Sequence, residues 1–100
     1  DLYYGISASL DMPPYVYIEG DRVTALPDHE TEDTGLRFWR KGPTASDFRH
    51  DEVLPRLTDK AVELVRSSAS SPFFLYFPLP APHTPILPVG RFAGASGTTP

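Results

Sequence analysis

The chain has no cysteine among its 100 residues, which excludes a disulfide framework, a thiolate zinc site and a cysteine nucleophile within it. It is also poor in basic side chains, with nine lysines and arginines against thirteen aspartates and glutamates and a formal charge of −4. Binding to a phosphate backbone requires a basic surface, so we expect no nucleic acid partner. No apolar run is longer than Phe73 to Phe77, which is too short for a membrane span.

The common catalytic signatures are missing as well. The sequence has no G-x-S-x-G nucleophile elbow, no H-E-x-x-H zinc motif, no P-loop and no G-x-G-x-x-G dinucleotide-binding loop. Proline, in contrast, is abundant, with twelve residues where about five per cent is usual. Each proline removes a backbone donor and fixes φ, so we expect long loops, above all between Pro72 and Pro88.

Two stretches in the first two thirds of the chain predict regular structure. β-Branched and aromatic residues at 15–18 and 22–24 flank Gly20, which can supply the positive φ of a tight turn, so they predict a small hairpin. Apolar residues recur at helical spacing from Leu54 to Ser68 and predict a helix. Between them, Pro27 to Gly35 is polar and acidic without an apolar face, and we expect a loop there.

The run Phe73 to Phe77 is apolar at every position, which is typical of a central strand covered on both faces. The sequence therefore predicts an α/β protein with one clear helix, one buried central strand, a small hairpin and long loops. One helix and one strand cannot cover both faces of such a sheet. Moreover, the chain starts at Asp1 rather than methionine and stops at Gly97-Thr-Thr-Pro100 without a closing element. We therefore expect an internal piece of a longer protein, truncated at both ends.

His83 is the first candidate for chemistry. It lies in the proline-rich loop 78–85 that follows the predicted strand, and in an open α/β sheet ligands bind beyond the carboxyl ends of the strands. The prolines stiffen the backbone, so this histidine would lose little conformational entropy on binding a ligand. An ordinary surface histidine in a proline-rich loop fits the same residues, and position alone does not decide between the two interpretations.

Two acidic clusters have ligand chemistry for a metal ion. The first is Asp28 to Asp33, which includes His29 but lacks the glycine and the alternating oxygens of a calcium loop, so we expect a solvated acidic loop. The second immediately precedes the predicted helix, where acidic residues are expected for capping and dipole reasons. Its members are Asp47, His50, Asp51 and Glu52.

The segment Arg37 to Lys41 interleaves basic and aromatic residues, a pattern that can hold an anion or stack on a base. In a net acidic chain we expect instead that Phe38 and Trp39 pack while Arg40 and Lys41 stay exposed.

Three blocks of the sequence carry a resemblance. They are Tyr4-Gly-Ile-Ser-Ala-Ser-Leu-Asp-Met-Pro-Pro-Tyr15, Leu54-Pro-Arg-Leu-Thr-Asp-Lys-Ala61 and Pro72-Phe-Phe-Leu-Tyr-Phe-Pro-Leu-Pro-Ala-Pro-His-Thr-Pro-Ile-Leu-Pro88. Together they resemble the middle of a type I sulfatase of the arylsulfatase kind. The last block is the most specific, because members of that family place a strand of the form Pro-Phe-Phe-Leu-Tyr before a proline-rich loop that carries an active-site histidine.

The resemblance implies an alkaline-phosphatase-like sandwich that hydrolyses small-molecule or glycan sulfate esters, with residues 1–100 as an internal part of one catalytic domain. In that family a formylglycine attacks sulfur beside a bound calcium ion. His83 matches the family histidine that hydrogen-bonds a sulfate oxygen or helps protonate the leaving oxygen, where a positioned donor must meet developing charge. Many members work in the periplasm, the lysosome or outside the cell.

The chain departs from this family at the reaction itself. The Cys-x-Pro-x-Arg site that matures to formylglycine is absent, and Ser70-Ser71-Pro72 does not supply its serine version. We therefore expect the nucleophile and the calcium ligands to lie outside this chain, and the chain alone to be inactive. Two alternatives stay open: a phosphatase or phosphonate hydrolase of the same superfamily, and a proline-rich interaction module that a partner domain reads through Pro82 to Pro88. A contribution of Asp28 to Asp33 or of Arg37 to Lys41 to substrate specificity is a further hypothesis.

Overall fold

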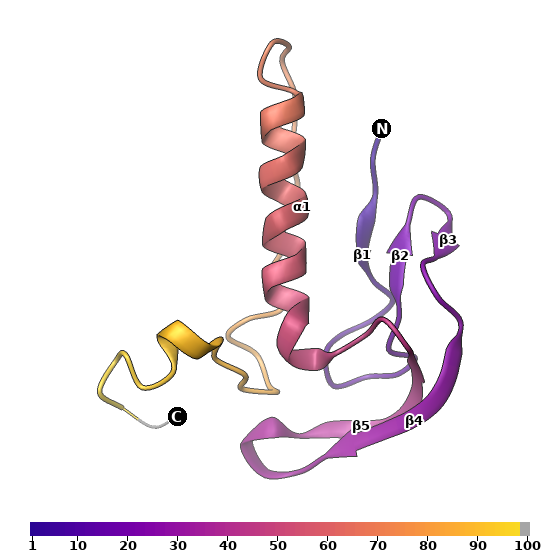
Figure 1. Cartoon of the computed structure of the whole chain (residues 1–100), viewed down its shortest axis with the longest axis vertical. Coiled ribbons are helices and arrows are strands. Elements are labelled where there is room, and N and C mark those ends of the chain that lie inside the picture. The colour runs from indigo at the N-terminus through magenta and orange to yellow at the C-terminus, as the bar shows by residue number, and fades with distance from the viewer. Residues whose placement is uncertain (99–100) are drawn as a thin grey trace.

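Two small antiparallel sheets and one long helix form the protein, which a computed structural model describes for residues 1–98 (Figure 1). The strands are β1 (Tyr4–Ile6), β2 (Tyr17–Glu19), β3 (Arg22–Val23), β4 (Pro27–Asp33) and β5 (Trp39–Ala45), and the helix is α1 (Val53–Ser67). Short 3-10 turns lie at Gly35–Arg37, His50–Glu52 and Gly90–Phe92. We expect no closing helix or strand at residues 97–100. Two of these residues, Thr99 and Pro100, lie outside the described part of the chain.

The predicted hairpin is confirmed as β2 and β3. Ile18 pairs with Val23 and Glu19 with Arg22 across a turn in which Gly20 has a φ of 64°. This positive φ is the conformation that glycine adopts without steric cost. The sheet also contains β1, antiparallel to β2, which the sequence pattern did not predict.

The prediction of a loop from Pro27 to Gly35 is wrong, because β4 forms there and pairs antiparallel with β5. The pairing runs from Pro27 opposite Ala45 to Asp33 opposite Trp39, with two register shifts on the way. β4 itself has no buried residue. Its partner β5 contributes buried side chains to the core, so β4 is held in place by pairing rather than by an apolar face of its own.

The predicted helix is confirmed and lies within one residue of the expected bounds. Its buried residues are Val53 and Leu57, both in the first half, whereas Val62 and Val65 in the second half are each 42% exposed. The apolar stripe of α1 is therefore covered over half of its length. No helix within residues 1–98 is long and apolar enough to cross a membrane.

The core consists of side chains from the first 57 residues, and aromatic rings dominate it. The Tyr17 ring stacks on Tyr4 with centroids 5.7 Å apart and packs against Phe48 at 5.0 Å. Tyr15 ties the two sheets together, because its amide donates to the Pro43 carbonyl at 2.8 Å and its carbonyl accepts from the Ala45 amide at 3.0 Å. The buried core residues are Leu10, Tyr15, Val16, Tyr17, Trp39, Ala45, Phe48, Val53 and Leu57.

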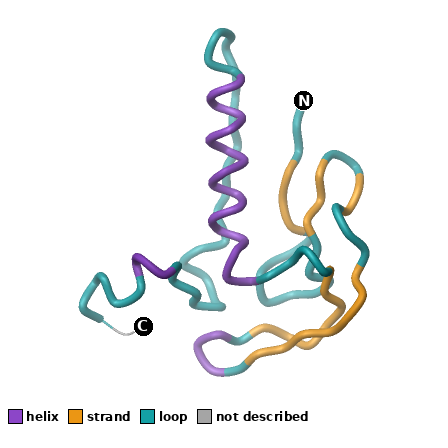
Figure 2. The backbone as a smooth tube through the Cα atoms, viewed as in Figure 1, coloured by secondary structure: helices purple, strands orange, loops and turns teal. Residues whose placement is uncertain are grey.

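The prediction of a buried central strand at Phe73 to Phe77 is wrong for this chain. Residues 72–80 belong to no strand, and Phe74 and Tyr76 are 90% and 78% exposed. In Figure 2 the segment is the loop that turns back from the far end of α1. The physical reason is that no strand of the described chain lies beside it to pair its backbone. The radius of gyration, 14.9 Å, exceeds the about 13 Å of a compact domain of this length.

Candidate active site around His83

The loop that carries His83 is fixed by its own backbone. The His83 amide donates to the Pro80 carbonyl at 3.2 Å, and the neighbouring Pro85 is buried. The ring is exposed, with Nδ1 2.7 Å from the Thr84 carbonyl oxygen. A carbonyl oxygen can only accept, so in this contact Nδ1 carries the hydrogen. Nε2 is then the ring nitrogen left to contact a ligand.

A carboxylate and a guanidinium from two distant segments form an ion pair. Arg40 Nη1 is 3.3 Å from Asp11 Oδ2, and the Arg40 amide donates to the Asp11 carbonyl at 3.2 Å. The hydroxyl of Ser9 donates to the other carboxylate oxygen of Asp11. The Asp11 side chain is 15% exposed and that of Arg40 is 55% exposed. These contacts hold the carboxylate in one orientation and leave part of the guanidinium open to solvent.

The electrostatics link Asp11 to His83. The hydrogen bond from Ser9 is the main cause that lowers the pKa of the Asp11 carboxyl below its ordinary value. Partial burial acts in the opposite direction, and the positive charges of Arg40 and His83 lower this pKa further. Asp11 is therefore ionised at neutral pH. The fold brings Asp11 and Arg40 into contact, and His83 acts on Asp11 through its charge alone; we refer to the three residues as the Asp11–Arg40–His83 group.

The Asp11–Arg40–His83 group has the chemistry of an oxyanion contact. Arg40 carries a permanent charge, and a guanidinium can donate to two oxygens of an anion at once. When the imidazole is protonated, the group contains two cations and one carboxylate, and its net charge is positive. Nε2 of His83 can then donate a hydrogen bond to an anionic oxygen or a proton to a leaving oxygen.

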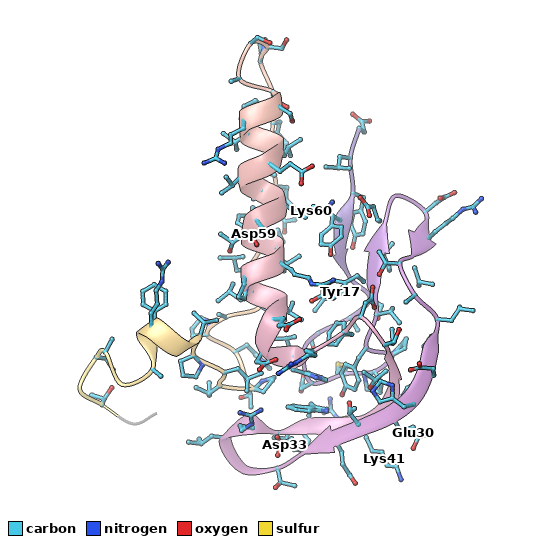
Figure 3. The ribbon with its side chains drawn as sticks, in the orientation of Figure 1. Tyr17, Glu30, Asp33, Lys41, Asp59 and Lys60 are labelled. Atoms are coloured by element: carbon cyan, nitrogen blue, oxygen red, sulfur yellow. The ribbon has the colours of Figure 1, made fainter. Side chains whose placement is uncertain are left out.

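The first acidic cluster forms surface ion pairs. His29 Nδ1 is 2.6 Å from Asp28, Arg37 Nε is 3.1 Å from Asp33, and Lys41 Nζ is 3.6 Å from Glu30. Figure 3 shows Glu30 and Lys41 at the outer edge of the β4–β5 hairpin. Within residues 1–98, no three histidine, aspartate or glutamate side chains gather where they could hold a metal ion.

The second acidic cluster is divided between surface and core. Asp51 accepts from Arg49 at 3.2 Å, and Asp51 and Glu52 lie in the turn before α1. Glu52 is the N-cap residue of α1, but its side chain makes no capping hydrogen bond, so the predicted capping role is not seen. His50 is different, because only 6% of its surface is exposed and its ring packs among aromatic rings. Burial lowers the pKa of His50 to about 4, so the ring is neutral at pH 7.

The prediction for Arg37 to Lys41 is confirmed except at Phe38. Trp39 is buried and Arg40 and Lys41 are exposed, but Phe38 is 40% exposed. Sequence reasoning missed the pairing of Arg40 with Asp11, since the two residues are 29 positions apart and lie in segments with no shared pattern. The signal available was that Asp11 belongs to the first of the three blocks that carry the family resemblance.

Comparison with known proteins gives one significant match among curated sequences. An N-acetylgalactosamine-6-O-sulfatase of Bacteroides thetaiotaomicron is 34% identical to the chain over 59 residues. The match covers 59% of this chain and 12% of that protein, so the chain spans a small part of its relative. No family model and no solved structure matches the chain. The comparison supports a sulfatase-like relationship at a coarse level.

Proposed function

We propose that the chain is part of a sulfuric ester hydrolase and that His83 contacts the sulfate group of the substrate. The observation that carries the proposal is the exposed ring of His83, whose Nδ1 is held by the Thr84 carbonyl and whose Nε2 is left for a ligand. The half-exposed guanidinium of Arg40, paired with Asp11, is a second donor for an anion. An anionic ester needs such donors, because negative charge develops on its oxygens as the ester bond breaks. The identity of 34% to a sulfatase supports the same class of substrate.

In the proposed reaction the bond between sulfur and the ester oxygen breaks, and sulfur is attacked by a nucleophile from outside this chain. His83 donates a proton from Nε2 to the ester oxygen, which leaves as an alcohol, or donates a hydrogen bond to a sulfate oxygen. Arg40 holds a second oxygen, and Asp11 orients Arg40. The family's formylglycine and calcium would supply nucleophile and Lewis acid. The described residues bring together no set of calcium ligands, so the part proposed for this chain is contact with the ester.

We further propose that residues 1–100 are an internal part of one catalytic domain with an alkaline-phosphatase-like sandwich. The exposed rings of Phe74 and Tyr76 support this proposal, because an extended apolar segment is stable only where strands and side chains cover it. The half-covered stripe of α1 supports it as well. In this proposal the covering strands come from other parts of the protein, and the isolated chain is inactive.

The two alternatives differ in how well they fit. A phosphatase or phosphonate hydrolase would use the same donors, since phosphate esters are also tetrahedral oxyanions, and the similarity to a sulfatase favours the sulfate ester. A proline-rich interaction module fits less well. Pro85 is buried and the Ile86 amide donates to the Leu36 carbonyl at 2.8 Å, so part of the segment from Pro82 to Pro88 is packed against its own chain.

The test uses the complete protein that contains this chain. His83→Ala should lower the turnover of 4-nitrophenyl sulfate by about two orders of magnitude or more, as loss of a positioned acid does. His29→Ala is the matched control, because His29 is exposed on β4 and forms its ion pair with Asp28. Unchanged turnover in His83→Ala would refute the role of this histidine. Faster turnover of 4-nitrophenyl phosphate than of the sulfate would favour the phosphatase alternative.

A further inference from the structure

Arg40 lies in a β-bulge of the β4–β5 hairpin. Thr31 of β4 lies opposite Gly42 of β5, and the next pair is Asp33 with Trp39. One residue of β4 therefore faces two residues of β5, of which Arg40 is one. A bulge interrupts the regular pairing of two strands and changes the direction of the side chains in it. Contacts from outside the hairpin are therefore important for the position of Arg40.

Two residues of the segment 11–15 make these contacts with the backbone of Arg40. The Arg40 amide donates to the Asp11 carbonyl at 3.2 Å, and the Arg40 carbonyl accepts from the Tyr15 hydroxyl at 2.5 Å. The guanidinium of Arg40 in turn pairs with the Asp11 carboxylate. The Tyr15 hydroxyl is thus the side-chain donor that fixes the backbone from which the guanidinium extends.

The ring of Tyr15 is itself held in place. Tyr15 is 1% exposed, and the rings of Phe48 and His50 pack against it with centroids 5.9 and 4.5 Å away. Side chains in such a filled core have little room to move, so the hydroxyl keeps its position. Burial is the main cause that raises the pKa of Tyr15 to about 12, so the hydroxyl keeps its proton and stays a donor at neutral pH.

We infer that the Tyr15 hydroxyl positions Arg40 for its contact with the anion, which makes Tyr15 a positioning residue of the reaction. The inference rests on the proposed function, in which Arg40 holds an oxygen of the sulfate group. Tyr15 is buried and acts through Arg40, whose side chain is 55% exposed. A donor stabilises a reacting group only in the right geometry, and a displacement of about 1 Å can lower a rate by about a hundredfold.

Tyr17 provides a matched control in the same core. Its side chain is fully buried as well, but its hydroxyl has no hydrogen-bond partner within residues 1–98. Its ring stacks on Tyr4 of β1 and lies below Arg56 of α1, whose guanidinium carbon is 5.0 Å from the ring centroid. The two buried tyrosines therefore differ in the hydrogen bond to the Arg40 carbonyl, which Tyr15 makes.

The test compares Tyr15→Phe with Tyr17→Phe in the complete protein, since each substitution removes a hydroxyl and keeps the ring. Tyr15→Phe should raise KM for 4-nitrophenyl sulfate by about tenfold and change kcat less, because Arg40 holds the sulfate group before the reaction as well as during it. Tyr17→Phe should change kcat/KM by less than about twofold. Arg40→Ala should lower kcat/KM, and Tyr15→Phe added to Arg40→Ala should lower it no further.

Equal effects of the two tyrosine substitutions, or a further loss from Tyr15→Phe in the Arg40→Ala protein, would overturn the inference. A Tyr15→Phe protein without helix signal in circular dichroism would also overturn it, because the hydroxyl would then be needed for folding.

Binding of inorganic sulfate, measured by calorimetric titration, separates this inference from the proposed function. Tyr15→Phe should weaken sulfate binding by about tenfold, and Tyr17→Phe should leave it unchanged. If the complete protein hydrolyses no sulfate ester, the proposed function fails, and the titration decides about Tyr15. If esters are hydrolysed but Tyr15→Phe binds sulfate as tightly as the natural protein, the inference fails by itself. A protein that neither binds sulfate nor hydrolyses its esters would overturn both.

Discussion

The imidazole of His50 stacks on the indole of Trp39, with ring centroids 3.7 Å apart and planes 11° from parallel. The rings of Tyr15 and Phe48 meet the same imidazole edge-on, at 4.5 and 5.1 Å. Nε2 of His50 has no hydrogen-bond partner within residues 1–98. This histidine therefore acts as an aromatic core residue that connects β5 to the turn before α1.

The burial of His50 makes stability depend on pH. Burial lowers its pKa from 6.5 to about 4, so below pH 6.5 the unfolded chain binds a proton that the folded chain does not. Stability is fully present above pH 6.5 and is lost as the pH falls towards 4. One pKa unit corresponds to 1.36 kcal/mol, so we expect a loss of about 3 kcal/mol in the free energy of unfolding over this range. Urea unfolding at a series of pH values measures it.

The matched variant is His50→Phe, which keeps an aromatic ring on Trp39 but cannot take up a proton. We expect this variant to be as stable as the natural protein at pH 7 or more so, since it removes a buried nitrogen without a partner. Between pH 6.5 and 4 it should lose less stability than the natural protein by about the same 3 kcal/mol. An identical pH dependence in both proteins would mean that His50 does not control it.

The parts of the fold that the sequence predicted are those whose pattern is local. The helix from Val53 follows from the spacing of its apolar residues, and the turn at Gly20 follows from one residue that tolerates a positive φ. The sequence does not predict β4, because this segment is a strand only through its pairing with β5. An acidic stretch without an apolar face contains no local pattern that predicts a partner strand. In the same way, Asp11 and Arg40 are brought together by the fold, and no local pattern connects them.

The error at Phe73 to Phe77 has a different cause. An apolar run indicates that a segment is buried when its partners are present, but it does not supply those partners. In the described chain Phe74 is 90% exposed, although its sequence is typical of a central strand. The residue types of a segment predict whether it must be buried in order to be stable. Whether it is buried depends on partner strands from the rest of the protein.

Gly42 in β5 should not tolerate a side chain. A Cβ atom at this position would lie 2.2 Å from Cβ and 2.5 Å from Cγ of Pro13, which is overlap. Gly42→Ala should therefore lower the free energy of unfolding by about 1–3 kcal/mol, as overpacking of a filled site does. Gly90→Ala is the control, because nothing lies within 4 Å of a Cβ at that position. Thermal unfolding of the two variants measures the difference, and equal melting temperatures would contradict the close packing of Pro13 on β5.

The Asp11 carboxylate should matter for turnover more than for stability. Asp11→Asn keeps the size of the side chain but removes the charge that pairs with Arg40 at 3.3 Å. We expect kcat/KM for 4-nitrophenyl sulfate to fall by about tenfold in the complete protein, because the guanidinium loses its orientation. Glu30→Gln removes the charge that pairs with Lys41 on the outer edge and should leave kcat/KM unchanged. The same loss in both variants would point to a general effect of charge on the protein.

The segment from Phe73 to Phe77 gives the last prediction. If it is a strand of a larger sandwich, Phe74 is exposed in this chain alone and buried in the complete protein. Phe74→Ser should then lower the free energy of unfolding of the complete protein by about 3–5 kcal/mol, the usual cost of removing a buried aromatic side chain. Leu26→Ser is the control, because Leu26 is exposed as well, at 77%, but connects β3 to β4. Each of these two strands already has a partner strand, β2 and β5 respectively.

In the isolated chain, where Phe74 is exposed, the same substitution should reduce the apolar surface that solvent reaches. There the exposed rings bind a hydrophobic dye such as ANS, and Phe74→Ser should reduce the dye fluorescence without loss of helix signal in circular dichroism, since α1 does not depend on Phe74. A complete protein in which Phe74→Ser costs no more than Leu26→Ser would show that the segment stays at the surface. The proposed sandwich would then lose its central strand, and with it the reason for placing His83 at the edge of a sheet.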